Sequence, residues 1–330
     1  MDSPNRLDPK DVRFFAGRSN PALAAAIAGY LQVPLDATRV HHFSNDNLYV
    51  QLGASVRSRA VFLVQSFSEP VHEHIFELLM MLDIARGAGA REVHAIIPYF
   101  SYARSDKKDA PRISITGRLM AKLIEAAGAT HVTTMTLHSP QAHGFFDMPT
   151  DVLTARPVFE EYFKRQDLSQ AIVVAPDGGR VRSAARFAHS LGLPVAAATK
   201  TRVSDTEVVI TGLIGEVEGR RRALIYDDEI ASGASVAAVA RLLPDRGIRE
   251  VTAVCTHGVF TGSSLQRLTA APELQSIVTT DTVRLPESKR APQVEVLTVA
   301  PLFGEAIRRN YLRESIGDLF TFWEDFRAED

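Results

Sequence analysis

The hydrophobic pattern alternates short, continuous apolar runs with segments of helical spacing. Residues 61–82, VFLVQSFSEPVHEHIFELLMML, predict a buried strand and then a helix, and residues 223–243, ALIYDDEIASGASVAAVARLL, repeat that order. A glycine, a charged turn and a second buried strand follow each of them, in 89–100 and 247–260. The sequence therefore repeats one order of elements, which is a strand, a loop, a helix and a second strand. It predicts an α/β fold with a parallel sheet that binds ligands at the carboxyl ends of its strands.

The second copy carries candidate chemistry where its first strand ends. Residues 223–226 predict a short buried strand, and Asp227 and Asp228 follow it directly. The small residues Ser232-Gly233-Ala234-Ser235 then predict a turn whose backbone N–H groups can surround a phosphate at the start of a helix. The two carboxylates suit a divalent cation or sugar hydroxyls. The alternative is a strand followed by a solvated acidic helix cap, which is less favoured for two adjacent carboxylates.

The first copy differs at the corresponding place. It has Gln65-Ser66 where the second copy has its carboxylates, and Glu69 and Pro70 where the second copy has small residues. Only the second half therefore keeps the predicted phosphate loop. The first half has either another part of the site, a subunit interface, or a purely structural role.

Charged or polar residues follow other predicted strands. Residues 98–109 place Arg104, Asp106, Lys107 and Lys108 beside aromatic Phe100 and Tyr102, a combination that can hold nucleotide phosphates and cover a base. A solvated loop is the alternative on this stretch alone.

Two further strand ends carry candidate metal or phosphate ligands. His138 follows one apolar segment, and Asp177 follows another, before two glycines that allow close backbone approach. A lone histidine is more often a packing residue, so this alternative stays open for His138.

Residues 197–222 begin with Lys200 and Arg202 and continue through polar residues as far as Val208. This composition suits a mobile flap that carries positive charge to a migrating phosphoryl group. An ordinary hairpin with a polar tip explains the same residues equally well.

Composition limits the class of protein. The 330 residues are 45% hydrophobic and 23% charged, which predicts a globular chain of two domains. A net charge of −2 provides no basic field for nucleic acid or an anionic membrane, and Cys255, the only cysteine, fits a reducing compartment. The first residues lack the apolar core of a signal peptide, and no apolar run approaches a membrane span. We expect a cytoplasmic protein that binds neither nucleic acid nor membrane.

With these stretches in order, the chain resembles the ribose-phosphate diphosphokinases, or 5-phosphoribosyl diphosphate synthetases, over nearly its whole length. The matching stretches are FAGRSNPALAAAIAGYL, VFLVQSFSEPVHEHIFELLMMLD, IIPYFSYARSDKK, GRLMAKLIEAAGATHVTTMTLHSPQAHGFFDMP, VVAPDGGRVRSAARFA, THGVFTGSSLQRL and VLTVAPLFGEAIRRNYLRESIGDLF. The resemblance implies an α/β fold of two tandem phosphoribosyltransferase-type domains, each a mainly parallel sheet flanked by helices.

The resemblance also implies a division of labour between the domains. We expect residues 1–155 to carry the ATP-site loop and a degenerate sugar-phosphate site. Residues 156–330 are expected to carry the ribose 5-phosphate site and a flexible catalytic loop, with the last segment packing back on the first domain.

The implied reaction transfers the β,γ-diphosphoryl group of Mg-ATP to the anomeric hydroxyl of ribose 5-phosphate and releases AMP. The implied catalytic residues are Lys200 and Arg202, and the implied metal ligands for Mg²⁺ are His138 and Asp177. The implied ATP-binding residues are Phe43, Asn45, Asn47, Arg104, Ser105, Asp106, Lys107 and His138. The implied ribose 5-phosphate-binding residues are Asp227, Asp228, Ala231, Ser232, Gly233, Ala234 and Ser235. The resemblance further implies a homo-oligomer, either a hexamer or a dimer.

The chain departs from the family pattern at three places. The sugar-phosphate loop has Ala231, Ser232 and Ser235 where the family usually has an Asp and threonines. The segment FSNDN carries Asn45 and Asn47 in place of two acids, and Ser105 replaces the Gln of the usual Arg-Gln-Asp. A non-catalytic or weakly active regulatory homologue that binds nucleotide and sugar phosphate is therefore one alternative. A phosphoribosyltransferase that consumes the product is the other.

Overall fold

The computed structural model of the chain describes residues 7–202 and 208–319, apart from the side chains of residues 200–202, 208–211 and 318. Contacts divide the chain into two compact units. Unit 1 contains residues 7–154, 282–284 and 299–319, and unit 2 contains residues 155–281 and 285–298. The carboxyl-terminal segment from residue 299 thus belongs to unit 1, and the roles expected of the two domains stay predictions.

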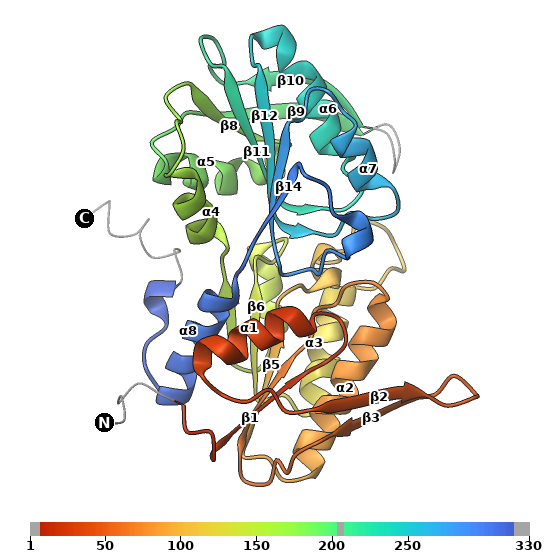
Figure 1. Cartoon of the computed structure of the whole chain (residues 1–330). Helices are drawn as coiled ribbons and strands as arrows, with labels where there is room; N and C mark the ends of the chain where they lie inside the picture. The colour runs from red at the N-terminus through yellow and green to blue at the C-terminus, as the bar shows by residue number, and fades with distance from the viewer. Residues whose placement is uncertain (1–6, 203–207, 320–330) are drawn as a thin grey trace, which may run out of the picture. The chain divides into compact units, whose positions relative to one another are not determined.

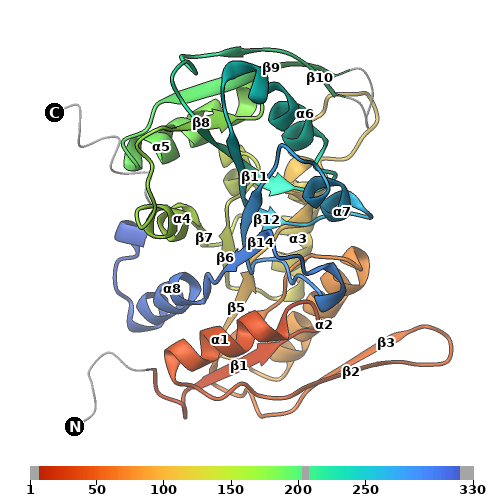
Figure 2. The same ribbon diagram turned by 45° about the horizontal axis from the view of Figure 1, so that its top comes forward.

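Unit 1 is built on a five-stranded parallel sheet in the order β1-β4-β5-β6-β7. Its strands are β1 Val12–Ala16, β4 Ala60–Val64, β5 Glu92–Ile97, β6 His131–Met135 and β7 Thr150–Leu153, and an antiparallel hairpin pairs β2 Thr38–His42 with β3 Leu48–Leu52. The helices are α1 Pro21–Leu31, α2 Val71–Gly87, α3 Thr116–Ala127 and α8 Ala300–Leu312, with short turns η1 Ser101–Arg104, η2 Pro140–Phe145 and η6 Gly317–Leu319. Figures 1 and 2 show α1 and α8 side by side on one face of this sheet.

The apolar runs of unit 1 are continuous because helices cover both faces of its sheet. In β4, Val61 and Leu63 pack with Leu78 and Met81 of α2, whereas Phe62 points to the other face and stacks on His94. Parallel strands that are buried on both faces read as unbroken hydrophobic segments. The apolar runs in the sequence therefore located β4 and β5, the two strands of the first copy.

Unit 2 is built on a seven-stranded sheet in the order β10-β9-β8-β11-β12-β13-β14, parallel except for the β9/β10 pair. Its strands are β8 Ala171–Ala175, β9 Val195–Arg202, β10 Val208–Ile214, β11 Arg222–Ile230, β12 Glu250–Gly258, β13 Ser276–Thr280 and β14 Val294–Leu297. Its helices are α4 Arg156–Phe163, α5 Val181–Ser190, α6 Ala234–Leu242 and α7 Ser264–Thr269, with short turns η3 Gly178–Arg180, η4 Pro244–Arg246 and η5 Glu287–Lys289. The α/β class expected from the sequence is confirmed.

The duplicated design is confirmed, with one correction. In unit 1 β4, α2 and β5 follow one another with β4 parallel to β5, and in unit 2 β11, α6 and β12 do the same. The predicted strand 223–226 is too short, because β11 continues to Ile230. Pairing with β12 extends to Ile230↔Gly258, so the backbone stays in the sheet after the side chains become polar.

Polar contacts hold the last helix on unit 1. Asn310 in α8 donates through Nδ2 to Asp151 Oδ2 at 2.7 Å, and the same oxygen lies 2.7 Å from His131 Nε2. Tyr311 donates to Asp11 Oδ2 at 3.1 Å. These bonds bring the carboxyl-terminal segment to strands that begin far earlier in the sequence.

The contact between α1 and α8 requires a glycine. A Cβ added at Gly304 would lie 2.3 Å from Tyr30 Cδ1 and 2.9 Å from Tyr30 Cγ, distances that side-chain atoms do not tolerate. The Tyr30 ring therefore lies directly on the α8 backbone, and Gly304 leaves room for that ring without breaking the helix.

We predict that Gly304→Ala lowers the free energy of unfolding by about 1–3 kcal/mol, the usual effect of overpacking. In a Tyr30→Ala background the same change should be neutral or stabilising, because alanine favours helix over glycine by about 1 kcal/mol. Urea unfolding followed by circular dichroism measures all four proteins. An equal loss in both backgrounds would refute the Tyr30 contact as the cause.

Candidate active site

The acidic pair lies inside strand β11 of unit 2. Asp228 is buried and its Oδ2 lies 3.0 Å from Arg180 Nη1, and the Asp228 amide donates to Asp227 Oδ1 at 2.9 Å. Pairing of β11 with β8 runs through Ile225↔Val174, whereas pairing with β12 continues past the carboxylates. The pair thus lies where β11 extends beyond its neighbour β8, at the carboxyl end of a parallel sheet.

Arg180 reaches the pair from a turn that packs against β11. Its turn, η3, begins after Asp177, whose Oδ1 accepts the Gly179 amide at 2.9 Å, and Ser183 Oγ donates to the Arg180 carbonyl at 2.9 Å. Sequence reasoning did not include Arg180 among the site residues. The sequence pattern that could have identified it is a cationic residue directly after two glycines at the end of a strand.

Burial and crowding of like charge change the titration of this pair. Removal from water, and then the neighbouring carboxylate of Asp228, hold the pKa of Asp227 well above its usual range, while Arg180 acts in the opposite direction. Burial likewise raises the pKa of the Cys255 thiol, which is paired with Asp227 across the strands, to about 12. One guanidinium therefore lies near two adjacent carboxyl groups, and the raised pKa of Asp227 favours its protonated form.

The loop after β11 is held by backbone contacts. Gly233 has φ +73°, and a Cβ there would lie 2.8 Å from Leu268 Cδ1, so the position requires glycine for both conformation and space. The Ala231 carbonyl accepts the Thr261 amide at 3.0 Å, and the Ser232 carbonyl accepts from Arg267 Nη2 at 3.4 Å. Helix α6 begins at Ala234, so its first amides are at this loop.

The structure gives no side-chain geometry for the two predicted catalytic residues. Lys200 and Arg202 are on strand β9, where the backbone pairs Lys200 with Ile210 and Arg202 with Val208 of β10. Both side chains, and residues 203–207 between the strands, are outside the described part of the chain. The segment forms an antiparallel hairpin, and its predicted catalytic role stays a prediction.

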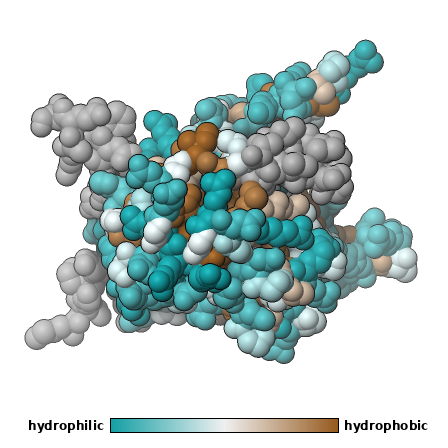
Figure 3. Space-filling model, turned by 90° about the horizontal axis from the view of Figure 1, so that it is seen from above, coloured by the Kyte–Doolittle hydropathy of each residue, from teal (hydrophilic) through white to brown (hydrophobic). Residues whose placement is uncertain are grey.

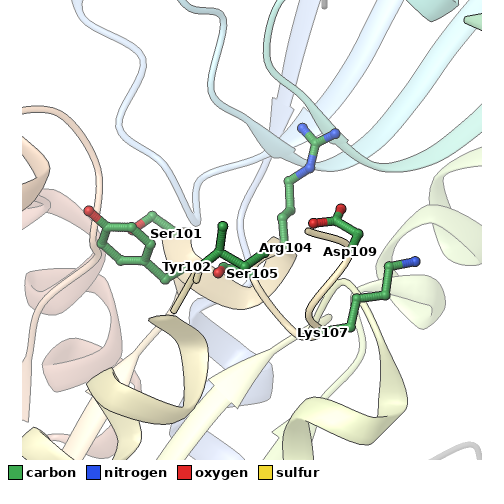
Figure 4. A pocket seen from close by; sticks show the side chains of 7 residues that line it. Ser101, Tyr102, Arg104, Ser105, Lys107 and Asp109 are labelled. Carbon is green, nitrogen blue, oxygen red and sulfur yellow. The ribbon is translucent and has the colours of Figure 1, made fainter. Parts of the chain in front are cut away.

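Unit 1 contains a second candidate region, a hollow of about 310 Å³ between η1 and the loop before α3 (Figure 4). Its lining is formed by Ser101, Tyr102, Arg104, Ser105, Lys107, Asp109 and Ile113. Arg104 and Lys107 are exposed there, so two cations border one space. Three of the predicted ATP-binding residues, Arg104, Ser105 and Lys107, thus meet at this hollow.

The other predicted ATP-binding residues lie elsewhere in unit 1. Phe43, Asn45 and Asn47 are at the turn of the β2/β3 hairpin, and none of them lines the hollow in the described part of the chain. Phe43 is 51% exposed and its ring lies edge-on to His41 and Tyr49. Asn45 Oδ1 accepts the Asn47 amide at 3.3 Å, so its side chain closes its own turn. Asp106 and His138 are half-buried and do not line the hollow either.

The strand end of the first copy has a structural role. Gln65 and Ser66 are fully buried; Gln65 Oε1 accepts from Ser19 Oγ at 2.6 Å, and Ser66 Oγ donates to the Thr282 carbonyl at 2.7 Å. Gln65 Nε2 also donates to the His74 carbonyl at 3.1 Å. Of the alternatives open for this strand end, the structural one therefore describes these two residues best.

The described residues contain no cluster of three or more histidine, cysteine, aspartate or glutamate side chains that could hold a metal ion. His138 in unit 1 and Asp177 in unit 2 are each half-buried, which leaves part of each side chain at the surface.

No helix in the described part of the chain is both long and apolar enough to cross a membrane. Figure 3 shows a face on which hydrophilic residues predominate and hydrophobic ones form small separate patches.

Comparison with known proteins identifies the class of this site. Residues 12–128 match the N-terminal domain of ribose phosphate pyrophosphokinase, and residues 202–321 match the phosphoribosyl synthetase-associated domain. The chain belongs to the ribose-phosphate pyrophosphokinase family, as the sequence predicted, and it is an enzyme of phosphoribosyl pyrophosphate synthesis.

The relatives match almost from end to end. A protein of Streptomyces coelicolor is 48% identical over 94% of this chain and 98% of its own length. A ribose-phosphate pyrophosphokinase of Deinococcus radiodurans is 45% identical over 93% of this chain and 97% of its own. The crystal structure of phosphoribosylpyrophosphate synthetase from Mycobacterium smegmatis superimposes with a TM-score of 0.86 at 35% identity, and covers 92% of this chain and 99% of that one.

The raised pKa of Asp227 generates a prediction about stability. A carboxyl group whose folded pKa lies above its unfolded value of ~3.9 stabilises the fold below that value and loses this contribution as the pH rises through the folded pKa. Asp227→Asn removes the titration. The variant should therefore gain stability relative to the wild type as the pH rises from about 4 upward.

Urea unfolding of both proteins at a series of pH values measures this difference, with the exposed Asp245→Asn as the surface control. A difference between Asp227→Asn and the wild type that is flat or falls as the pH rises above about 4 would contradict the raised pKa of Asp227.

Proposed function

We propose that the chain is a ribose-phosphate diphosphokinase that transfers the β,γ-diphosphoryl group of Mg-ATP to the anomeric hydroxyl of ribose 5-phosphate, giving 5-phosphoribosyl diphosphate and AMP. The observation that carries the proposal is the pair Asp227–Asp228, neutralised in part by Arg180 and followed by a glycine-bearing loop at the start of α6. The carboxylate oxygens can accept hydrogen bonds from sugar hydroxyls, and the neighbouring backbone amides can donate hydrogen bonds to a phosphate.

The sugar phosphate occupies unit 2 in this proposal. Asp227 and Asp228 accept hydrogen bonds from ribose hydroxyls, and the amides of residues 232–235 donate to the 5-phosphate. Ala231 contributes only its backbone, whose carbonyl is already bonded to the Thr261 amide. The loop therefore binds the phosphate without the carboxylate that relatives usually carry there.

The nucleotide occupies the cationic side of unit 1. Arg104 and Lys107 border the hollow and neutralise phosphate charge, with Asp106 and His138 assigned to the same substrate by the family pattern. Phe43, Asn45 and Asn47 are assigned to the adenine. The exposed ring of Phe43 supports this assignment, because an exposed aromatic ring is available for stacking on a base.

The proposed cofactor is Mg²⁺. Magnesium usually binds proteins through one or two carboxylates and takes its other ligands from water and substrate phosphates, so a cage of three protein ligands is not required. The partly exposed Asp177 carboxylate fits that pattern better than the His138 imidazole, since oxygen ligands suit this ion. Asp177 would hold the ion, which would supply positive charge to offset the charge of the substrate phosphates.

Lys200 and Arg202 supply the remaining positive charge. Transfer of a diphosphoryl group depends on positioning and on stabilising charge that develops in the transition state. Both residues are on the hairpin strand β9, beside β8 in unit 2. We also propose a cytoplasmic location and assembly into a homo-oligomer, a hexamer or a dimer.

A product assay tests the proposal. Purified chain is mixed with Mg-ATP and ribose 5-phosphate, and ³¹P NMR follows the phosphorus resonances. Equal release of AMP and 5-phosphoribosyl diphosphate is expected. Binding of both substrates without turnover would instead indicate the regulatory homologue, and diphosphate release from 5-phosphoribosyl diphosphate plus a base would indicate a phosphoribosyltransferase.

The sugar assignment predicts the effect of Asp228→Asn. The substitution removes a charge-assisted acceptor worth roughly 1.5–3 kcal/mol, so the KM for ribose 5-phosphate should rise about 10–100-fold. Steady-state kinetics measure it, with Asp245→Asn as the matched surface control. An unchanged KM with unchanged turnover would exclude Asp228 from sugar binding.

The catalytic assignment predicts a different signature for Lys200→Ala and, separately, Arg202→Ala. Each should lower kcat by at least ~10²-fold, the effect of removing one preorganised charge-stabilising donor. The affinities for ATP and ribose 5-phosphate, measured by calorimetry, should change far less, since the charge acts mainly in the transition state. Near-normal turnover, or affinity lost in proportion to rate, would remove the residue from catalysis.

A further inference from the structure

Ser105 departs from the family pattern, and the structure gives its hydroxyl a specific local task. Ser105 Oγ accepts the Thr116 amide at 3.1 Å and donates to the Ser114 carbonyl at 3.3 Å. The Ser105 carbonyl accepts the Gly117 amide at 3.2 Å. These three hydrogen bonds, named here the Ser105 clasp, join the end of η1 to the start of helix α3.

The clasp closes the loop of residues 106–115. Lys107, Asp109 and Ile113 of this loop line the hollow. Ser101, Tyr102 and Arg104 line it from η1 on the other side, and Ser105 lines it between them. Ser105 therefore connects the two sides of the hollow. The position of Lys107 relative to Arg104 depends on the hydrogen bonds that Ser105 makes.

The loop has little else to hold it. Every residue from 106 to 115, all within the described part of the chain, keeps part of its surface exposed. Arg112 lies in the left-handed region with φ +62°, an unfavourable conformation for a residue with a side chain. Such a loop keeps one conformation only where its ends are fixed.

The base of the loop is also tightly packed. A Cβ on Gly117 would lie 2.9 Å from the Tyr102 carbonyl oxygen and 3.3 Å from the Ser105 carbonyl oxygen. The backbone of α3 and that of η1 thus approach closely at the place where the clasp forms. The Thr116 amide is one of the helix-start donors without a partner in its own helix, and Ser105 Oγ supplies that partner.

We infer that Ser105 is a positioning residue. Its hydroxyl preorganises the loop of residues 106–115 for nucleotide and does not itself contact the nucleotide. This inference rests on the proposed function, because it assigns the hollow to ATP. A loop that is ordered before binding loses less entropy on binding, so the clasp acts on nucleotide affinity. It leaves the sugar site in unit 2 unaffected.

Two measurements on the full-length protein test the inference. In the first, hydrogen exchange without nucleotide compares the wild type with Ser105→Ala, which removes the hydroxyl, and Ser105→Thr, which keeps it. Residues 106–117 should exchange at least ~5-fold faster in the alanine variant, in proportion to the loss of one net hydrogen bond, and within ~2-fold of the wild type in the threonine variant. Unchanged exchange in Ser105→Ala would overturn the clasp.

In the second measurement, Ser105→Ala should raise the KM for ATP about 5-fold and leave kcat and the KM for ribose 5-phosphate within ~2-fold. Ser105→Thr should restore the wild-type KM. Ser114→Ala is the matched control, because it removes an exposed hydroxyl from the same loop and keeps the carbonyl that the clasp uses.

The outcomes separate this inference from the proposed function. A higher KM for ATP without faster exchange would mean direct contact with nucleotide, and faster exchange without a change in KM would mean a purely structural bond. Either result would overturn the positioning role. If the wild type shows no turnover, the proposed function fails, and calorimetric titration with ATP then decides whether Ser105→Ala weakens nucleotide binding about 5-fold.

Discussion

The confinement of two adjacent carboxyl groups beside one guanidinium is the constraint on which unit 2 depends. Arg180 Nη1 lies 3.0 Å from Asp228 Oδ2 and offsets its charge, while burial and the neighbouring Asp228 carboxylate raise the pKa of Asp227. The Asp177 cap of η3 and the Ser183 bond to the Arg180 carbonyl hold the backbone of the turn that carries this guanidinium. The polar site is thus built on the hydrophobic sheet by a small number of charge-bearing contacts.

The two copies of the strand, loop and helix design carry different side chains at the corresponding strand end. In unit 2 the position holds charge and remains partly open, whereas in unit 1 Gln65 and Ser66 are neutral and fully bonded to Ser19, His74 and Thr282. A neutral network of this kind is stable without a ligand, because each buried polar group already has a partner. A carboxylate pair carries acceptor oxygens and negative charge, and the proposed function assigns them to the sugar hydroxyls.

The sequence was sufficient for features that depend on local pattern. Continuous apolar runs located the buried strands, and the repeated order of elements together with the family motifs predicted the α/β class and the family, both confirmed. The length of β11 could not be predicted, because its last residues are kept in the sheet by pairing with β12, a segment about twenty residues further along the chain. Arg180 was missed for a similar reason, since only the fold brings η3 against β11.

Ser105 illustrates a different limit. Its place in a family motif implies a part in ATP binding, and that assignment stays a prediction. The structure adds that its hydroxyl bonds to the start of α3, a partner that the motif does not reveal. Lys200 and Arg202 are on strand β9, and their side chains lie outside the described part of the chain. Their assignment, like those of Mg²⁺ and the oligomer, stays a prediction.

The most direct measurement of the central claim is ¹³C NMR of protein labelled at the aspartate carboxyl carbons, titrated with ribose 5-phosphate. Spectra of Asp227→Asn and Asp228→Asn assign the two signals. The account predicts that both resonances shift to saturation with the sugar phosphate, while that of exposed Asp245 does not move. Saturable binding detected in the ligand's own ³¹P signal, with both carboxyl resonances unmoved, would contradict it.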